Sequence, residues 1–228
     1  MNAPTVNFLH GRQTDDRSKT MNLFFDRLGV MKKLLEILVL SLFLITPSQA
    51  NDIRDFQIEG MSIGDSALEY FDLEQINNAK GDIYCRNSNK LECANFYSAT
   101  FWDLPKFEIY DAVRYHAKNK DRKHIIYSIN GQIFFPDNFE GCLNKKDSIL
   151  RESSEIVKDL KKGFDGTIKH KADKSGKSFG VSTEYYFPNG DSFTVACYNW
   201  SKEMGHPHTL HADLSEKDFT NWLNKIYK

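Results

Sequence analysis

The sequence predicts an α+β protein whose antiparallel sheet, or sheets, are built from hairpins and packed by helices. Strand-like segments follow one another across turn signals, and hairpins between neighbours produce antiparallel pairs. A short helix pair, one long helix and a C-terminal helix complete the prediction. The 17 Phe, 10 Tyr and 3 Trp favour a β-rich core. Helices followed by strands occur twice, which hints at a duplication, although the residues themselves show no repeat.

Two short helices are predicted first. Ser66 to Glu69 has the form of a capping box and begins a helix that runs to Phe71. The signal is repeated at Asp72 to Gln75, so a second short helix is expected there. A strand is then predicted at residues 107–117, where apolar and polar side chains alternate.

Two hairpins are predicted around Asn-Gly pairs, because Asn-Gly between strand-like segments is the strongest short signal for a hairpin turn. Asn130-Gly131 stands in the middle of residues 125–135, and Asn189-Gly190 stands in the middle of residues 179–200. Each pair is expected to turn one strand back along the next. A further short strand is expected near residues 210–214.

A long amphipathic stretch lies between the two hairpins, and its apolar residues recur at helical spacing. They are Phe139, Cys142, Leu143, Ile149, Leu150, Ile156, Val157 and Leu160. The helix is expected to end at Gly163, and the polar residues 165–178 predict a loop. A final helix is expected after the cap at residues 215–218. Its buried side would contain Phe219, Trp222, Leu223 and Ile226.

An export signal is predicted inside the chain. Residues 31–50 begin with two lysines, continue with a short apolar run and end on small residues, which is typical of a secretory signal peptide cleaved after Ala50. The apolar run is shorter than the roughly 20 residues that span a bilayer, so no stable membrane anchor is expected after cleavage. The residue directly after Ala50 is not the cysteine that a lipoprotein would require. The product is expected to be periplasmic or secreted.

The predicted signal peptide divides the chain. Residues 1–30 are expected to be a spurious extension, because Met31 is itself a plausible start and Met21 is another candidate. Residues 51–228 are expected to form a single exported α+β domain. The whole chain has 30 Lys and Arg against 31 Asp and Glu, of which six and four precede residue 51, so the domain has a net charge of −3.

The composition excludes several classes of protein. With 40% hydrophobic residues and a net charge of −1, the chain is neither a disordered polyampholyte nor a coiled coil. A near-neutral charge also excludes a strongly basic nucleic-acid binder. We therefore expect no nucleic acid as a partner. No catalytic set, cofactor motif or metal site is predicted with a complete pattern of residues.

The four cysteines agree with export, because an even number in an exported chain indicates disulfides. Cys85 and Cys93 flank a polar loop that suits a local bridge. Cys142 lies on the apolar face of the long helix, and Cys197 shares strand parity with the apolar Phe193 and Val195. The predicted bonds are thus Cys142–Cys197 and Cys85–Cys93. Four buried free thiols are the alternative, and the opposite strand face is apolar too, so parity alone leaves the pairing open.

Two serines suggest a hydrolase as the alternative function. Gly60 to Gly64 fits the G-x-S-x-G pattern around Ser62, and Gly64-Asp65-Ser66 is similar to the block of the GDSL hydrolases. The first pattern needs a parallel sheet, whereas hairpins are predicted here. The D-x-x-H of the second belongs near a C-terminus, and Asp121 to His124 lies mid-chain. A turn followed by a helix cap is therefore the favoured interpretation.

Two further clusters have an ordinary interpretation. His206, His208 and His211 are close enough in sequence to suggest a Zn²⁺ or Cu²⁺ site, but their strand parity scatters them and favours loop histidines. The segment 165–178 is basic through Lys169, Lys171, Lys174 and Lys177, so an anionic partner would fit there. A solvated loop is the favoured interpretation. Gly176-Lys177-Ser178 lacks the earlier glycine of a P-loop.

Three segments resemble a group of small exported proteins of marine alphaproteobacteria. They are FQIEGMSIGDSALEYF at 56–71, HKADKSGKS at 170–178 and ACYNWSKEMG at 196–205. The resemblance covers most of residues 55–228, with the Cys85–Cys93 segment as an insertion, and implies no catalytic residues.

The opening I-x-G-M-S-x-G-x-S is also similar to small β-barrel-assembly lipoproteins and to β-lactamase-inhibitor-like domains. This resemblance implies a helix pair on an antiparallel sheet that binds other proteins. The missing lipoprotein cysteine departs from the first of these two patterns. The expected function is therefore that of a non-enzymatic envelope protein, a protein-binding or scaffold domain whose partner is another envelope protein.

Overall fold

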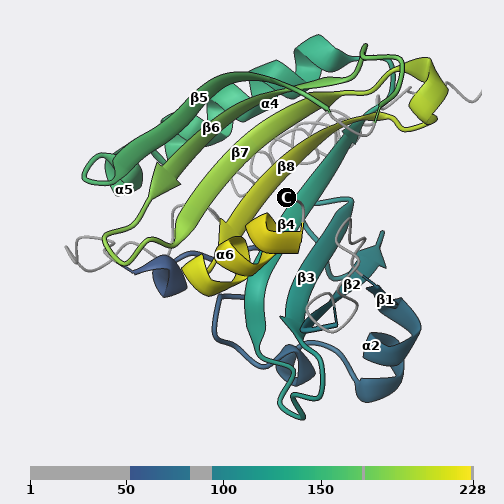
Figure 1. Cartoon of the computed structure of the whole chain (residues 1–228), viewed down its shortest axis with the longest axis vertical. Helices are drawn as coiled ribbons and strands as arrows, with labels where there is room; N and C mark the ends of the chain where they lie inside the picture. Colours follow the sequence, from purple (N-terminus) through teal and green to yellow (C-terminus); the bar gives the residue numbers. More distant parts are fainter. Residues whose placement is uncertain (1–51, 83–93, 171–172, 227–228) are drawn as a thin grey trace, which may run out of the picture. The chain divides into compact units, whose positions relative to one another are not determined.

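The computed structural model describes residues 52–82, 94–170 and 173–226, all within a compact unit that spans residues 49–228 (Figure 1). An open, eight-stranded antiparallel sheet is combined with helices, which confirms the predicted α+β class. The strands are β1 (Lys80–Asp82), β2 (Phe96–Trp102), β3 (Ala112–Lys118), β4 (Ile126–Phe135), β5 (Lys161–Lys169), β6 (Phe179–Tyr186), β7 (Ser192–Asn199) and β8 (His208–Ser215). The α-helices are α2 (Leu73–Ala79), α4 (Phe139–Glu152), α5 (Ser154–Val157) and α6 (Lys217–Ile226), and the short 3₁₀ helices are η1 (Ile53–Asp55), η2 (Ala67–Glu69) and η3 (Lys202–Met204).

The sheet has two halves that mirror each other in order. Its strands are arranged β1-β2-β3-β4-β8-β7-β6-β5, so each half is a meander of four strands and the halves meet where β4 pairs with β8. Helical segments precede the strands in each half: η2 and α2 in the first, α4 and α5 in the second. The same repeated order of helices followed by strands is predicted from the sequence.

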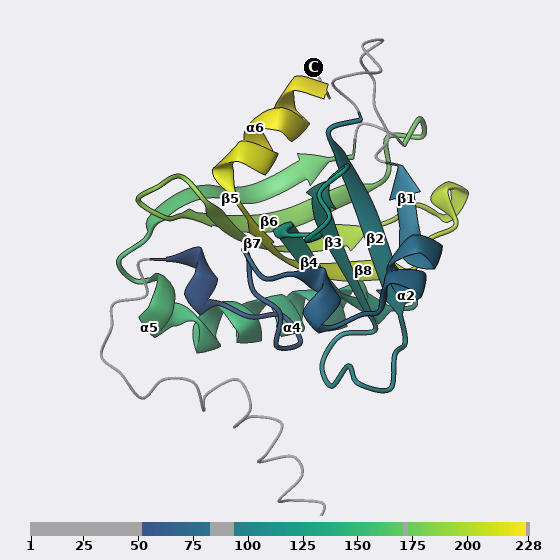
Figure 2. The same ribbon diagram turned by 90° about the horizontal axis from the view of Figure 1, so that it is seen from below.

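One face of the sheet, here called the helix face, contains the main core. Phe71, which precedes α2, stacks on Phe101 of β2 with ring centroids 3.7 Å apart. Ile76 of α2 and Val157 of α5 are buried in the same cluster as Val195 of β7. Figure 2 shows α4 lying along this face, below the strands. Residues 53–79 and the helices α4 and α5 therefore shield the helix face from water.

The opposite face, here called the open face, is covered by α6 at one end (Figure 2). Phe219 and Trp222 of α6 pack on Phe96 of β2, with ring centroids 5.2 and 4.8 Å apart. Phe219 also stacks on His116 of β3 at 4.5 Å. The other described α-helices belong to the helix face, so much of the open face has no described helix against it.

Both predicted N-terminal caps are present. The Ser66 side chain accepts a hydrogen bond from the backbone N–H of Leu68 at the start of η2. Asp72 and Gln75 form a reciprocal capping box at the start of α2. The first of the two predicted helices is a single 3₁₀ turn of three residues, between its N-cap Ser66 and its C-cap Tyr70.

The predicted hairpin at Asn130-Gly131 is wrong, because both residues lie inside the continuous strand β4. Asn130 pairs with Arg114 on one side and with Asp213 on the other, so the strand is central and not a turn. The glycine serves packing: a Cβ at Gly131 would lie 2.6 Å from the Tyr110 ring. The second hairpin is confirmed, since β6 pairs with β7 across Asn189-Gly190.

The extent of the long helix was also predicted incorrectly. It ends as α4 at Glu152, and after Ser153 the separate turn α5 follows. Gly163 does not end a helix but lies in β5, which occupies residues 161–169. The strand therefore includes residues 165–169, the first part of the predicted loop. A polar, exposed edge strand has little apolar alternation, which explains why the composition predicted a loop.

The first half of the sheet differs from the prediction at two places. Residues 107–111 precede the strand, which begins at Ala112, and β2 was not predicted. The loop before β3 is held by Glu59, whose carboxylate accepts hydrogen bonds from three consecutive backbone N–H groups, those of residues 108–110, at 2.8–2.9 Å. The strand predicted near 210–214 is present as β8, and the C-terminal helix is present as α6.

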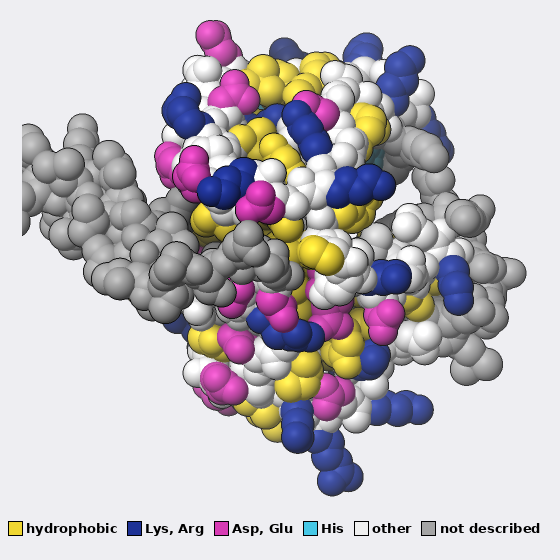
Figure 3. Space-filling model, turned by 90° about the vertical axis from the view of Figure 1, so that its left-hand side faces the viewer, with side chains coloured by type: hydrophobic (Ala, Val, Ile, Leu, Met, Phe, Trp, Pro, Cys, Tyr) yellow, Lys and Arg dark blue, Asp and Glu magenta, His cyan; other side chains and the backbone are white. Residues whose placement is uncertain are grey.

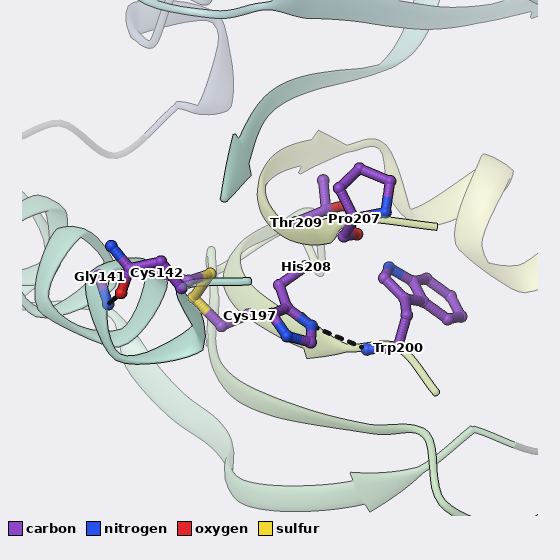
Figure 4. Close-up of a disulfide and its surroundings, with 8 residues drawn as sticks. Gly141, Cys142, Cys197, Trp200, Pro207, His208 and Thr209 are labelled. Atoms are coloured by element: carbon purple, nitrogen blue, oxygen red, sulfur yellow. Dashed lines mark hydrogen bonds between the residues drawn. A yellow bond between two sulfur atoms is a disulfide. The ribbon is translucent and has the colours of Figure 1, made fainter. Parts of the chain in front are cut away.

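A disulfide joins α4 to β7, as predicted. Cys142 and Cys197 are both fully buried, with their Cα atoms 5.9 Å apart, and Figure 4 shows the bond between the helix and the strand. Cys197 lies on the helix face together with Phe193 and Val195, which settles the parity that the sequence left open. The predicted Cys85–Cys93 bond lies outside the described residues.

Candidate functional site

The candidate site is the part of the open face that α6 leaves uncovered. Side chains alternate between the two faces along each strand, so the strand register assigns residues to this face. The larger ones are Thr100, Trp102, Arg114, Asn130, Gln132, Phe134, Ile168, Tyr198, His211 and Asp213. They form an apolar stripe and a polar cluster beside it.

The apolar stripe crosses the sheet from β2 to β5. At one end Trp102 stacks on Phe134 of β4, with centroids 5.8 Å apart and planes 18° apart. Between their strands stands Ala112, whose small side chain lets the two rings meet over β3. Trp102 is 56% exposed, although burying the large apolar surface of a tryptophan ring is favourable.

The other end of the stripe is formed by Tyr198 of β7 and Ile168 of β5. Phe134, Thr209, Tyr198, Gly180 and Ile168 are aligned across neighbouring strands in one row. A Cβ at Gly180 would lie 3.0 Å from the Tyr198 ring and 3.6 Å from Ile168, so both side chains lean over this glycine. Ile168 is 43% exposed. The stripe therefore presents apolar groups to solvent at both ends.

An aromatic cluster extends the stripe beyond the end of β7. Trp200 stacks on Tyr198 at 5.5 Å, and the His170 and His206 rings meet Trp200 edge-on at 4.5 and 5.4 Å. On the other side of Tyr198, the His211 ring lies 4.8 Å away. Aromatic rings that hold one another in place lose little conformational freedom when a ligand contacts them.

The polar cluster lies between the stripe and α6. Gln132 donates to the side-chain oxygen of Asn130 at 2.6 Å, and Asn130 donates to the Asp213 carboxylate at 2.7 Å. Nearby, Arg114 donates from Nε to the Thr100 hydroxyl at 2.9 Å. The cluster thus contains one hydrogen-bonded chain that links β4 and β8 and one hydrogen bond that links β2 and β3.

Burial shifts the acid–base properties of this cluster. It raises the pKa of Asp213 to about 7, although the hydrogen bond from Asn130 and the charge of Arg114 act in the opposite direction. Burial, and to a smaller extent Arg114, lower the pKa of both His116 and His211 to about 3. Both imidazoles are neutral at neutral pH. The arginine keeps its charge, so the cluster contains a permanent cation beside an acid that titrates near pH 7.

The hydrogen bonds of the two serines considered for a hydrolase support the alternative interpretation, a turn followed by a helix cap. The Ser62 hydroxyl donates to the backbone carbonyl of Phe56 at 2.9 Å, and the Ser66 hydroxyl donates to that of Lys123 at 2.6 Å. Asp65 accepts from the backbone N–H of Ser62 and from the Tyr70 hydroxyl. These contacts close the turn before η2, as expected from the glycines and the cap.

The three clustered histidines lie in different surroundings. His208 lies on the helix face, where its Nδ1 accepts from the backbone N–H of Trp200 at 3.3 Å (Figure 4). His211 lies on the open face, and His206 is exposed. Within residues 52–82, 94–170 and 173–226, no three His, Cys, Asp or Glu side chains are grouped so that they could bind a metal ion.

The described lysines of the basic segment 165–178 lie in different surroundings, and Lys171 lies outside the described residues. Lys169 belongs to β5, Lys177 is ion-paired with Glu203 at 2.7 Å, and Asp173 folds the turn by accepting from the backbone N–H groups of Ser175 and Ser178. Figure 3 shows acidic and basic side chains interspersed with apolar ones on the side of the molecule that faces left in Figure 1. An anionic partner would therefore find no concentrated positive charge among the described residues of this side.

Fold and site together define a class: an α+β protein with an open antiparallel sheet, one face of which is closed by helices while the other presents an aromatic stripe beside a polar network. The chain matches no protein-family model, no curated protein and no solved structure significantly. The site is therefore interpreted from its own residues. Trp102 and Phe134 were not identified as site residues from the sequence. If β2 and the unbroken β4 had been predicted, the strand register would have placed these two residues on the same face.

Proposed function

We propose that the protein is an exported, non-enzymatic envelope protein, and that it acts as a protein-binding or scaffold domain whose contact surface is the open face. The exposed aromatic stripe carries this proposal, because Trp102 stacks on Phe134 and yet is 56% exposed. Aromatic residues and arginine are enriched in protein interfaces and supply most of their binding energy. The partner is another envelope protein.

The arrangement of the open face supports a protein partner. A rigid apolar stripe offers anchor sites, and the buried network of Gln132, Asn130 and Asp213 links strands β4 and β8 beside it and so helps to hold the stripe in place. Preordered groups reduce the entropy lost on association. The resemblance to β-lactamase-inhibitor-like domains and to β-barrel-assembly lipoproteins points to the same class of function.

Photo-crosslinking is expected to identify the partner through the stripe. A photoreactive amino acid at position 102 or 168 should capture one specific envelope protein in the native host, whereas the same group at Lys145 of α4, on the other side of the sheet, should not. With the captured partner purified, Trp102→Ala should weaken binding about 30-fold, equivalent to about 2 kcal/mol, in calorimetry. Equal crosslinking from position 145, or unchanged affinity of the Trp102→Ala variant, would contradict the proposal.

The place of action follows from residues 31–50, which we propose to be a signal peptide cleaved after Ala50 with delivery to the periplasm or the medium. The disulfide Cys142–Cys197 is compatible with an oxidising compartment. Among the described residues, no helix has the length and apolarity to cross a membrane. No nucleic acid is expected as a partner, since the net charge of the domain is −3.

Protein isolated from the native host is expected to begin at Asn51. Signal peptidase requires small residues before the cut, so Ala50→Arg should leave the leader attached, whereas Asn51→Ser should not affect processing. N-terminal sequencing and intact-mass measurement distinguish these products. A wild-type product that begins at Met1, or one that keeps residues 31–50 in the membrane fraction, would refute the export proposal.

A further inference from the structure

A basic hollow lies at the end of the sheet where β3 turns into β4. Figure 1 shows the course of the chain through this turn. Its volume is about 420 Å³, a size typical of sites for small ligands. The described residues that line it are Lys80, Tyr97, Lys118, Lys120, Asp121, Arg122 and His124. They come from β1, β2, β3 and the β3–β4 turn, so the fold gathers them from separate segments.

The charges around the basic hollow are predominantly positive. It is lined by three lysines and one arginine against the single acid Asp121, although the domain as a whole is acidic. The Asp121 carboxylate is engaged within the turn, where it accepts from the backbone N–H groups of Lys123 and Ile125 at 2.9 and 3.0 Å. This single carboxylate balances one of the four cations, so the lining side chains have a net charge of +3 with His124 left out of the count.

None of the cations of the hollow forms an ion pair with another described acid. In the part of the chain that the structure describes, the ion pairs join other residues. Lys80 and Lys118 instead lie over aromatic rings, with Nζ 4.2 Å from the Tyr97 centroid and 4.3 Å from the Tyr127 centroid. A ring positions an ammonium group without cancelling its charge. Acids of α6 lie near Lys118, so Lys80, Lys120 and Arg122 are the more available cations.

The floor of the hollow provides a directional donor. The Tyr97 hydroxyl lies 2.6 Å from Nδ1 of His124 and 3.4 Å from the Tyr115 hydroxyl. Burial raises the pKa of Tyr97, so this phenol keeps its proton. When Tyr97 donates to Nδ1, the proton of the neutral imidazole is on Nε2, which can then donate to a bound acceptor.

We propose that the basic hollow binds an anion that carries a phosphate group, held by Lys80, Lys120 and Arg122 and by a hydrogen bond from His124. Several cations and one imidazole N–H suit the unesterified oxygens of a phosphate group, and arginine can bind two of them at once. Free phosphate, a soluble phosphorylated metabolite and a phospholipid headgroup share this chemistry. The residues proposed to bind the anion belong neither to the stripe nor to the polar cluster, so the site does not depend on the protein-binding proposal.

Nuclear magnetic resonance titration with inorganic phosphate tests the site. At low ionic strength, the resonances of His124 and of the β3–β4 turn should shift saturably, with a Kd below about 10 mM. The double variant Lys120→Gln/Arg122→Gln should weaken this Kd at least tenfold. The matched double variant Lys161→Gln/Lys174→Gln, which removes two exposed lysines elsewhere, should leave it unchanged. All proteins are first compared by thermal unfolding to establish that they are folded.

Two ligand series identify the source of the phosphate. Glycerol phosphate bound more tightly than inorganic phosphate indicates a soluble phosphomonoester. Preferential binding to phosphatidylglycerol vesicles over phosphatidylcholine vesicles, lost in Lys120→Gln/Arg122→Gln, indicates a headgroup. Either result supports the proposal. The absence of saturable binding of all these probes to the wild type overturns it, as does an equal loss of affinity in the matched control variant.

Discussion

Replacing both Cys142 and Cys197 by alanine is expected to lower the free energy of unfolding by about 4 kcal/mol. The bond closes a loop with a sequence separation of 55, and closing a loop of this length removes about that much chain entropy from the unfolded state. Alanine is preferable to serine because both positions are fully buried and a hydroxyl there would need a partner. Urea denaturation of the oxidised proteins measures the difference.

The double variant Cys85→Ala/Cys93→Ala is the matched comparison for this disulfide. Its predicted loop is short, and the same chain-entropy estimate is about 2.5 kcal/mol. The loss at Cys142 and Cys197 should therefore be the larger of the two. Peptide mapping of unreduced protein that links Cys142 or Cys197 to one of the other cysteines would show that the predicted pairing is wrong.

The stability of the protein is expected to depend on pH through Asp213. Its folded pKa is raised from 3.8 to about 7, so between these values the folded state keeps a proton that the unfolded state releases. The stability attributable to this carboxyl is therefore greatest below pH 4 and falls as the pH rises to 7. The slope is at most about 1.4 kcal/mol per pH unit.

Asp213→Asn should remove this dependence, because the amide oxygen can still accept from Asn130 but no longer ionises. Relative to the variant, the wild type should lose stability between pH 4 and pH 7 by an amount on the order of 3 kcal/mol. His116 and His211 act in the opposite direction below pH 6.5, but they are present in both proteins. Asp218→Asn, at an exposed position of α6, serves as the control. Parallel pH profiles for the wild type and Asp213→Asn would contradict the assignment.

Local signals predicted those elements whose residues interact with near neighbours. The caps at Ser66 and Asp72, the turn at Asn189-Gly190 and the apolar row of Cys197 all depend on contacts within a few residues or on simple alternation. Such signals are available from the sequence because the native contacts are local. The disulfide joins residues 55 positions apart, and it could be predicted because local spacing placed each cysteine on an apolar face of its own element.

The errors arose where distant contacts override a local preference. Asn130-Gly131 has the residues of a turn, yet the native sheet uses the amide to bind Asp213 and the missing Cβ to admit Tyr110. Gly163 has the residue type of a helix end but lies within an edge strand. The open-face stripe needs the register of seven strands, and an isolated sequence does not specify that register.

The strand β5 has a consequence for the behaviour of the protein in concentrated solution. As the outermost strand it has one side without a partner strand, and such edges promote aggregation. Its register shifts between Lys162 and Asp165, and it contains Lys161, Lys162 and Lys169. Pairing of two such edges would bring ammonium groups of both copies together along a bent seam. The edge thereby resists growth of the sheet from one copy of the protein into the next, while Ile168 on the same strand remains available to the open face.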